Sequence, residues 1–123
     1  MKWYTDGAGW NGKFSRWAVA NDLGLERIIV KYERFTNNQA EYLAMRDGLT
    51  LAKDGDEICS DSELIVNQLL GSYRVKKVKL KPLHEECRNI ISKKAVKLSV
   101  IRREVNKAGR LLERTKMPGA SQD

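Results

Sequence analysis

Trp3-Tyr4-Thr5-Asp6-Gly7-Ala8-Gly9 is the stretch that decides the fold. Its aromatic and β-branched start predicts a strand, and the two glycines predict a sharp turn that also lets a ligand approach the main chain. Asp6 stands where the strand gives way to this turn. An aspartate in that position is often only a turn residue. Its meaning therefore depends on whether other carboxylates converge on it.

The length and composition are those of one folded domain. The 123 residues are 41% hydrophobic and 32% charged, which argues against an intrinsically disordered protein. No apolar run approaches the roughly 20 residues that span a bilayer. Met1 leads almost directly into the first strand without a signal-peptide pattern. We therefore expect a cytoplasmic protein without a membrane segment, with a single domain at residues 1–116 and a disordered tail at residues 117–123.

The cysteines and the histidine do not indicate a metal site of the zinc type. Cys59 and Cys87 lack CxxC spacing and a companion histidine pair, so buried reduced thiols are predicted rather than a disulfide. His84 is the single histidine and has no cysteine or acid pattern near it. We predict that it is a surface residue.

Charge is distributed unevenly along the chain, whose net charge is +7. Residues 1–72 hold 8 basic and 11 acidic groups, whereas residues 73–116 hold 15 basic and 4 acidic groups. This asymmetry is either a solubility feature or the property of a polyanion-binding protein whose acidic pocket adjoins a phosphate-binding surface. Residues 73–81 alternate basic and apolar groups, which predicts an extended segment with lysines along one side.

The first third of the chain predicts an antiparallel meander. Asn11-Gly12 and the stretch 21–24 are turn signals, and strand-like composition surrounds them. The three predicted strands are residues 3–6, 13–20 and 26–34.

The spacing of the apolar residues then becomes that of a helix. Thr36-Asn37-Asn38-Gln39 has the form of a capping box and predicts a helix at residues 37–53. A short strand at residues 57–60 follows, and a right-handed crossover would place it parallel to the first strand. Asp61 would then lie close to Asp6 at the carboxyl edge of the sheet, where α/β proteins commonly build their sites.

The remaining elements continue this α/β pattern. Ser60-Asp61-Ser62-Glu63 predicts a capping box for a helix that ends at Gly71, and Pro82 opens another helix. The later elements are predicted as a helix at 82–94, a parallel strand at 95–101 and a helix at 107–116.

Three acids are brought together by this topology. Asp6, Glu41 and Asp61 would repel one another unless they are protonated or bridged by a cation. Oxygen ligands of this kind suit Mg²⁺ or Mn²⁺. Two alternatives stay open, because Glu41 also suits the dipole of a helix start and Asp61 also suits helix capping.

Four blocks of the sequence resemble type 1 ribonuclease H in order and spacing over about residues 3–113. They are Tyr4-Thr5-Asp6-Gly7-Ala8-Gly9, Thr36-Asn37-Asn38-Gln39-Ala40-Glu41, Ser60-Asp61-Ser62 and Arg103-Glu104-Val105-Asn106-Lys107. The second block is the most specific. The resemblance implies a five-stranded mixed sheet in the order 3-2-1-4-5, with strands 1 to 3 antiparallel, strands 1, 4 and 5 parallel, and helices on both faces. It also implies a monomer that hydrolyses the RNA strand of RNA/DNA hybrids, with Mg²⁺ or Mn²⁺ held by Asp6, Glu41 and Asp61.

The same resemblance implies a set of substrate contacts. The RNA strand would meet the backbone of Gly7, Ala8 and Gly9 and the side chains of Asn37, Asn38 and Gln39. A phosphate of the DNA strand would meet Asn11, Arg34 and Thr36. Residues 74–81 stand where longer relatives carry an additional basic helix and loop.

One position departs from the family pattern. Relatives supply a fourth carboxylate from the last helix in a pattern like Asn-x-x-Ala-Asp, but this chain reads Asn106-Lys107-Ala108-Gly109-Arg110. Asn106 is the predicted substitute as a catalytic residue and metal ligand, ahead of Glu104 and Glu113. Its amide oxygen can bind a metal but cannot act as a base. The loop histidine of many relatives is also missing.

Two other functions are compatible with these residues. A hybrid-binding module that has lost catalysis would bind without cleaving, although it would gain nothing from three mutually repelling acids. A DNA nuclease, integrase or resolvase would share the acidic cluster on the same fold. The second block and the lack of an appended DNA-binding domain favour the ribonuclease.

Overall fold

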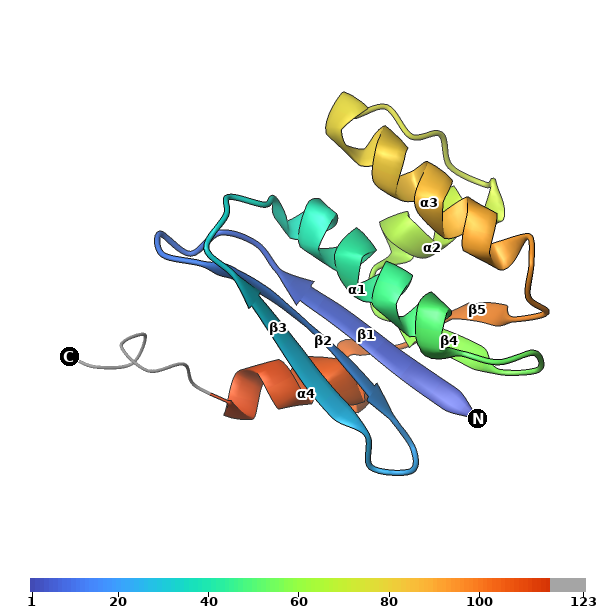
Figure 1. The fold of residues 1–123 in the computed structure, drawn as a ribbon, viewed down its shortest axis with the longest axis horizontal. Helices are drawn as coiled ribbons and strands as arrows, with labels where there is room; N and C mark the ends of the chain where they lie inside the picture. The colour runs from blue at the N-terminus through green and yellow to red at the C-terminus, as the bar shows by residue number, and fades with distance from the viewer. Residues whose placement is uncertain (116–123) are drawn as a thin grey trace.

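A mixed five-stranded sheet in the order β3-β2-β1-β4-β5 forms the centre of the computed structural model (Figure 1). The strands are β1 (Lys2–Ala8), β2 (Ser15–Asn21), β3 (Glu26–Lys31), β4 (Glu57–Ser60) and β5 (Lys97–Val100). β1, β2 and β3 are antiparallel neighbours, whereas β1, β4 and β5 are parallel. This confirms the predicted order and directions. The structure describes residues 1–115, so the tail predicted at 117–123 lies outside the described residues.

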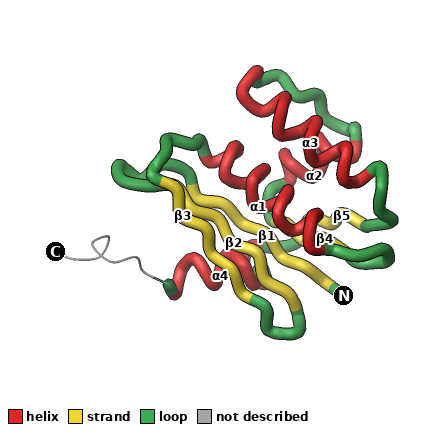
Figure 2. Tube along the Cα trace, in the orientation of Figure 1, coloured by secondary structure: helices red, strands yellow, loops and turns green. Residues whose placement is uncertain are grey.

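Helices cover both faces of the sheet, as predicted. α1, α2 and α3 lie on one face and α4 lies on the other (Figures 1 and 2). The helices are α1 (Asn37–Leu51), α2 (Glu63–Leu70), α3 (Lys81–Ile91) and α4 (Lys107–Arg114), with 3-10 turns at Val78–Leu80 and Arg103–Val105. Within residues 1–115, none of these helices has the length and apolar character needed to cross a membrane.

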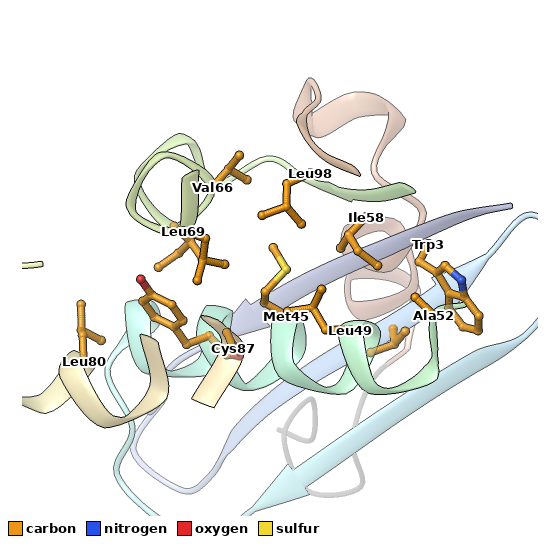
Figure 3. Packing of buried hydrophobic residues seen from close by; sticks show 13 residues of the cluster. Trp3, Met45, Leu49, Ala52, Ile58, Val66, Leu69, Leu80, Cys87 and Leu98 are labelled. Carbon is orange, nitrogen blue, oxygen red and sulfur yellow. Dashed lines mark hydrogen bonds between the residues drawn. The ribbon is translucent and has the colours of Figure 1, made fainter. Parts of the chain in front are cut away.

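The strand side chains alternate between two cores. Trp3 and Ile58 pack against Met45 and Leu49 of α1 (Figure 3), while Tyr4 and its neighbours pack against α4. Because alternate residues of a strand point the same way, Asp6 shares the α4 face with Tyr4. Full burial of a side chain such as Leu49 contributes roughly 1.5–3 kcal/mol. The two cores therefore hold the end of β1 between α1 and α4.

Both cysteines are buried free thiols, as predicted. His84, predicted as a surface residue, is half-buried. Its Nε2 lies 3.0 Å from the carbonyl oxygen of Gln68, and its ring packs edge-on against Tyr42 with centroids 6.3 Å apart. It lies on the side of α3 that faces α1 and α2. Its place in the sequence, two residues after Pro82, did not indicate these contacts.

The extended segment predicted at residues 73–81 is wrong. The chain is irregular as far as Lys77 and then forms the 3-10 turn at Val78–Leu80. Val78 is 76% exposed and only Leu80 of this turn is buried, so the apolar positions do not share one buried face. The ends of other predicted elements differ from the observed ends by up to three residues. The strand predicted at 26–34 stops at Lys31, and the helix predicted at 82–94 stops at Ile91.

The helix predicted after Ser60 begins two residues later than the capping-box pattern indicated. Ser62 is the N-cap and its hydroxyl accepts a hydrogen bond from the backbone N–H of Ile65, whereas the Ser60 hydroxyl accepts one from the Ser62 N–H. Asp61 therefore does not cap α2, and its carboxylate is available for other contacts. Gly71 ends the helix in the left-handed conformation, as predicted.

A lysine side chain caps the end of α1. Nζ of Lys94 lies 2.8–2.9 Å from the carbonyl oxygens of Leu49, Thr50 and Ala52, which the helix itself leaves unpaired. We expect Lys94→Met to lower the free energy of unfolding by about 1–3 kcal/mol, because these are hydrogen bonds to a charged donor. Urea denaturation measures the loss. Lys93→Met, at the exposed neighbouring position, is the matched control, and equal midpoints for the two variants would contradict the prediction.

Candidate active site

The site begins where the parallel ladder between β1 and β4 stops. The last pair is Thr5 with Ser60, but β1 continues beside β2 until Ala8. Asp6 and Asp61 are therefore the first residues beyond the paired segment, on neighbouring strands at the same edge. Asp6 lies inside β1 rather than at its end, so the turn-residue explanation of this aspartate does not apply.

Gly7 places Glu41 beside Asp6. With no partner on β4, the backbone N–H of Gly7 donates to Oε1 of Glu41 at 3.0 Å. A Cβ atom at Gly7 would lie 2.3 Å from the carbonyl carbon of Ala40, so any other residue would push α1 away from the strand. The sharp turn predicted from the glycines is wrong, because the positive-φ glycines of residues 1–115 do not include Gly7 or Gly9. Close approach to α1 is the reason for glycine here.

The start of α1 is fixed by the predicted capping box. Oγ1 of Thr36 accepts from the Gln39 N–H at 3.1 Å, and Oε1 of Gln39 accepts from the Thr36 N–H at 2.8 Å. Oδ1 of Asn37 accepts from the Gly9 N–H at 2.8 Å. These bonds hold the first turn of the helix against the loop after β1, which orients Glu41 toward the sheet.

The three predicted acids meet at this point. One oxygen from each of Asp6, Glu41 and Asp61 lies within 4.8 Å of the others, and each residue is half-buried. Burial and the neighbouring carboxylates raise the pKa of Asp6 to about 6 and that of Glu41 to about 8. The Gly7 N–H and the Arg103 guanidinium act in the opposite direction but more weakly. The carboxylates thus repel one another and favour a counter-cation.

The donor set fits a hard divalent cation. Within residues 1–115 this is the single group of three or more His, Cys, Asp or Glu side chains placed to hold a metal ion. All its donors are carboxylate oxygens, which suit Mg²⁺ and Mn²⁺ better than zinc or copper. The mutual repulsion that raises the pKa values is removed when a cation binds between the acids.

Asn106 has a different role from the one predicted. It is fully buried, and its Oδ1 accepts from the N–H groups of Ala108 and Gly109 as the N-cap of α4. Its Nδ2 donates to the Thr5 carbonyl at 3.0 Å and to Oδ2 of Asp61 at 3.2 Å. With both amide atoms occupied, the side chain does not fit the predicted ligand and catalytic role. It positions Asp61 and ties α4 to β1.

A cavity of about 410 Å³ opens over two of the acids, Asp6 and Glu41. Its lining includes Asp6, Glu41, Asn38, Arg103 and Glu113. Arg103 and the backbone of Gly109 are site residues that sequence reasoning did not single out. The sequence feature that could have indicated Arg103 is its place as a basic residue a few positions before Asn106, the N-cap of the last helix. Glu104, in contrast, is 69% exposed and pairs with Arg102 at 3.6 Å.

The predicted substrate residues lie at the end of β1, in the loops that follow β1 and β3, and in the first turn of α1. The Trp10 N–H donates to the Phe35 carbonyl at 2.8 Å, which brings the loop of Asn11 beside that of Arg34 and Thr36. The Arg34 guanidinium lies 5.6 Å from the centroid of the Trp10 ring. Several of these side chains already serve the fold, because the oxygens of Asn11, Thr36, Asn37 and Gln39 accept backbone N–H groups. Asn38, which lines the cavity, has no such bond among the described residues.

The sheet order, the helices on both faces and the acids at the strand edge define a ribonuclease H-like protein. Solved structures support this class. The N-terminal ribonuclease H domain of a Mycobacterium tuberculosis protein, solved as a maltose-binding protein fusion, is similar over 89% of this chain and 88% of that one, with 24% identity and a TM-score of 0.77. Ribonuclease H1 from the halophilic archaeon Halobacterium salinarum has 24% identity and a TM-score of 0.73, covering 90% and 92%.

A third solved structure is that of LC11 ribonuclease H1 in complex with an RNA/DNA hybrid, which is 28% identical with a TM-score of 0.68, covering 90% of this chain and 91% of that one. The metagenomic source of LC11 is compost. No curated protein sequence matches. Residues 15–113 match the reverse transcriptase-like family. The chain therefore belongs to this family, as a type 1 ribonuclease H-like member, which confirms the resemblance seen in the sequence.

The raised pKa values give a pH-dependent stability. Below its unfolded pKa of 4.5, Glu41 is protonated in both states; as the pH rises toward its folded pKa of about 8, the folded protein binds more protons than the unfolded chain. The free energy of unfolding therefore falls as the pH rises from about 4.5 to 8. In metal-free buffer we expect Glu41→Gln to remove much of this fall, roughly 1–3 kcal/mol.

Urea denaturation in EDTA at several pH values between 4.5 and 8 tests this. Glu33→Gln is the control, since Glu33 is an exposed glutamate outside the cluster. A pH dependence that is the same in both variants would contradict the effect assigned to Glu41.

Proposed function

We propose that this protein is an endonuclease that hydrolyses the RNA strand of RNA/DNA hybrids with Mg²⁺ or Mn²⁺. The observation that carries the proposal is the convergence of Asp6, Glu41 and Asp61 within 4.8 Å at the edge of a ribonuclease H-like sheet. Asp6, Glu41 and Asp61 would hold the ions, which would supply activation of a water and stabilisation of the leaving oxygen in phosphodiester hydrolysis.

The chain's own residues pre-arrange this site. The hydrogen bond from the Gly7 N–H fixes one oxygen of Glu41, and the hydrogen bond from Asn106 fixes one oxygen of Asp61. Asp6 is held between them by the backbone of β1. Carboxylates that are oriented before the ions arrive need little rearrangement, which favours the transition state.

Substrate binding follows from the charges and loops around the cavity. Arg103 is an exposed cation at the rim, suited to a phosphate of the cleaved strand. The backbone at residues 7–9 and the Asn38 side chain face the place where 2′-hydroxyls would distinguish RNA from DNA. The loop of Asn11 and Arg34 would take a phosphate of the DNA strand. A monomeric state and a cytoplasmic location remain predictions from the sequence.

Removal of the central carboxylate tests the enzymatic proposal. We expect Asp6→Asn to lower the rate of hybrid cleavage by at least about 1,000-fold, because the side chain keeps its shape but loses the charge that binds the ions. Gel analysis of a labelled RNA strand measures the rate, and thermal denaturation checks folding. Asp22→Asn, at an exposed turn position paired only with Lys107 among salt bridges of the described residues, is the matched control.

The wild-type protein also separates the competing functions. Cleavage of a hybrid but not of duplex DNA or duplex RNA, with either metal, supports the ribonuclease. Salt-dependent binding of the hybrid without cleavage would assign the chain to the hybrid-binding modules instead. Cleavage of duplex DNA would assign it to the DNA nucleases.

The Asn38 amide gives a prediction about affinity rather than chemistry. We expect Asn38→Ala to raise KM for the hybrid about 3- to 10-fold with little change in kcat, because the hydrogen bond it loses is worth about 0.5–1.5 kcal/mol. Steady-state kinetics measure both constants. Asn89→Ala, on the exposed side of α3, should leave them unchanged. A fall in kcat with an unchanged KM would place Asn38 in the chemical step instead.

A further inference from the structure

We propose that Glu113 supplies a fourth carboxylate to the metal site, reaching it from α4 across the bare backbone of Gly109. The inference rests on the proposed function, because it concerns the ions that this function requires. It differs from the sequence prediction, in which Asn106 filled this position.

Gly109 leaves an open path between α4 and the acids. A Cβ atom built at Gly109 would lie 3.2 Å from Oδ2 of Asp6, so the helix backbone approaches that carboxylate directly. No side chain from this position stands between the helix and the cavity. Gly109 is itself part of the cavity lining, together with Asp6 and Glu113.

The geometry of α4 directs Glu113 into this opening. Residues four positions apart lie on the same face of a helix, and each Cα–Cβ bond tilts toward the N-terminus. A side chain at position 113 therefore extends over position 109, which carries no side chain of its own. The negative charge of Glu113 is the smallest of the contributions that raise the pKa of Asp6, after burial and Asp61.

The other oxygen donors of this region are already engaged or point elsewhere. The amide oxygen of Asn106 accepts two backbone N–H groups, and Glu104 is paired with Arg102. Within residues 1–115, Glu113 makes no ion pair or side-chain hydrogen bond. Arg110, at the position of the family's acid, lines a second cavity of about 590 Å³ with Lys107, Arg114 and Glu113 itself, so Glu113 stands at the border between the two cavities.

A fourth carboxylate would help to balance the charge of two bound divalent ions. Two divalent ions bring four positive charges to three carboxylates, and hard ions need oxygen ligands on every side. Glu113 adds one negative charge from α4, on the opposite face of the sheet from α1, which carries Glu41. Because the side chain is exposed and long, it can move to an ion that the three inner acids already hold.

Manganese titration tests the role without depending on catalysis. The free Mn²⁺ signal in electron paramagnetic resonance gives the number and affinity of bound ions for the wild type, Glu113→Gln and Glu104→Gln. We expect Glu113→Gln to weaken the weaker binding event at least about 10-fold and to shift the Mn²⁺ midpoint of hybrid cleavage to higher concentration by a similar factor. Glu104→Gln is the matched control, with the same charge change on an acid outside the cavity, and should change neither.

The outcomes separate this inference from the proposed function. If the wild type cleaves hybrids and the two glutamine variants titrate alike in both measurements, the role of Glu113 is overturned while the ribonuclease stands. If the wild type binds Mn²⁺ but does not cleave, the proposed function fails and the titration alone decides for or against Glu113. If the wild type does neither, both proposals fall. Thermal denaturation of each variant confirms that it is folded.

Discussion

The contact between the backbone of β1 and the first turn of α1 is the constraint on which the site depends. At Gly7 the two backbones are so close that no side chain fits between them. The parallel ladder ends at Thr5, two residues before Gly7, and this frees the Gly7 N–H for Glu41. The strand, the helix and the Glu41 carboxylate are thus fixed by one short piece of main chain, and the Thr36 capping box holds the helix in that place.

The same arrangement of acids that can bind a cation lowers the stability of the folded protein when no cation is bound. Three half-buried acids within 4.8 Å lower the stability of the metal-free protein at neutral pH, as the raised pKa values of Asp6 and Glu41 indicate. An ion that binds only the folded state returns stability by about 2.7 kcal/mol when its concentration is 100 times Kd. In the metal-free protein, the two hydrophobic cores on either side of the sheet hold the elements that carry the acids together. Such tension between neighbouring charges is common where a site must bind cations.

The resemblance to type 1 ribonuclease H predicted the full sheet order. Periodicity, crossover handedness and a distinctive helix start predicted the helices and the meeting of Asp6, Glu41 and Asp61. It misassigned the residues whose role depends on close contacts between distant segments. Gly7 and Gly9 resembled turn glycines, yet they permit helix packing. Asn106 resembled a ligand, yet both of its amide atoms are used by β1, Asp61 and α4. His84 had no local signal for its contacts with Tyr42 and Gln68.

The last helix shows how such a site tolerates a changed acid. In α4 (Lys107–Arg114), Glu113 lies in the final turn, where the helix dipole disfavours a carboxylate by roughly 0.3–1 kcal/mol. Ordering a long glutamate side chain costs up to about 1.5–2 kcal/mol more. Both penalties are small beside the attraction of a carboxylate for a divalent ion in a partly buried site. A shift of the acid by less than one helical turn is therefore compatible with metal binding, provided that Gly109 keeps the path to Asp6 clear. The proposed role of Glu113 therefore requires both residues, because the glutamate supplies the carboxylate and the glycine leaves its path open.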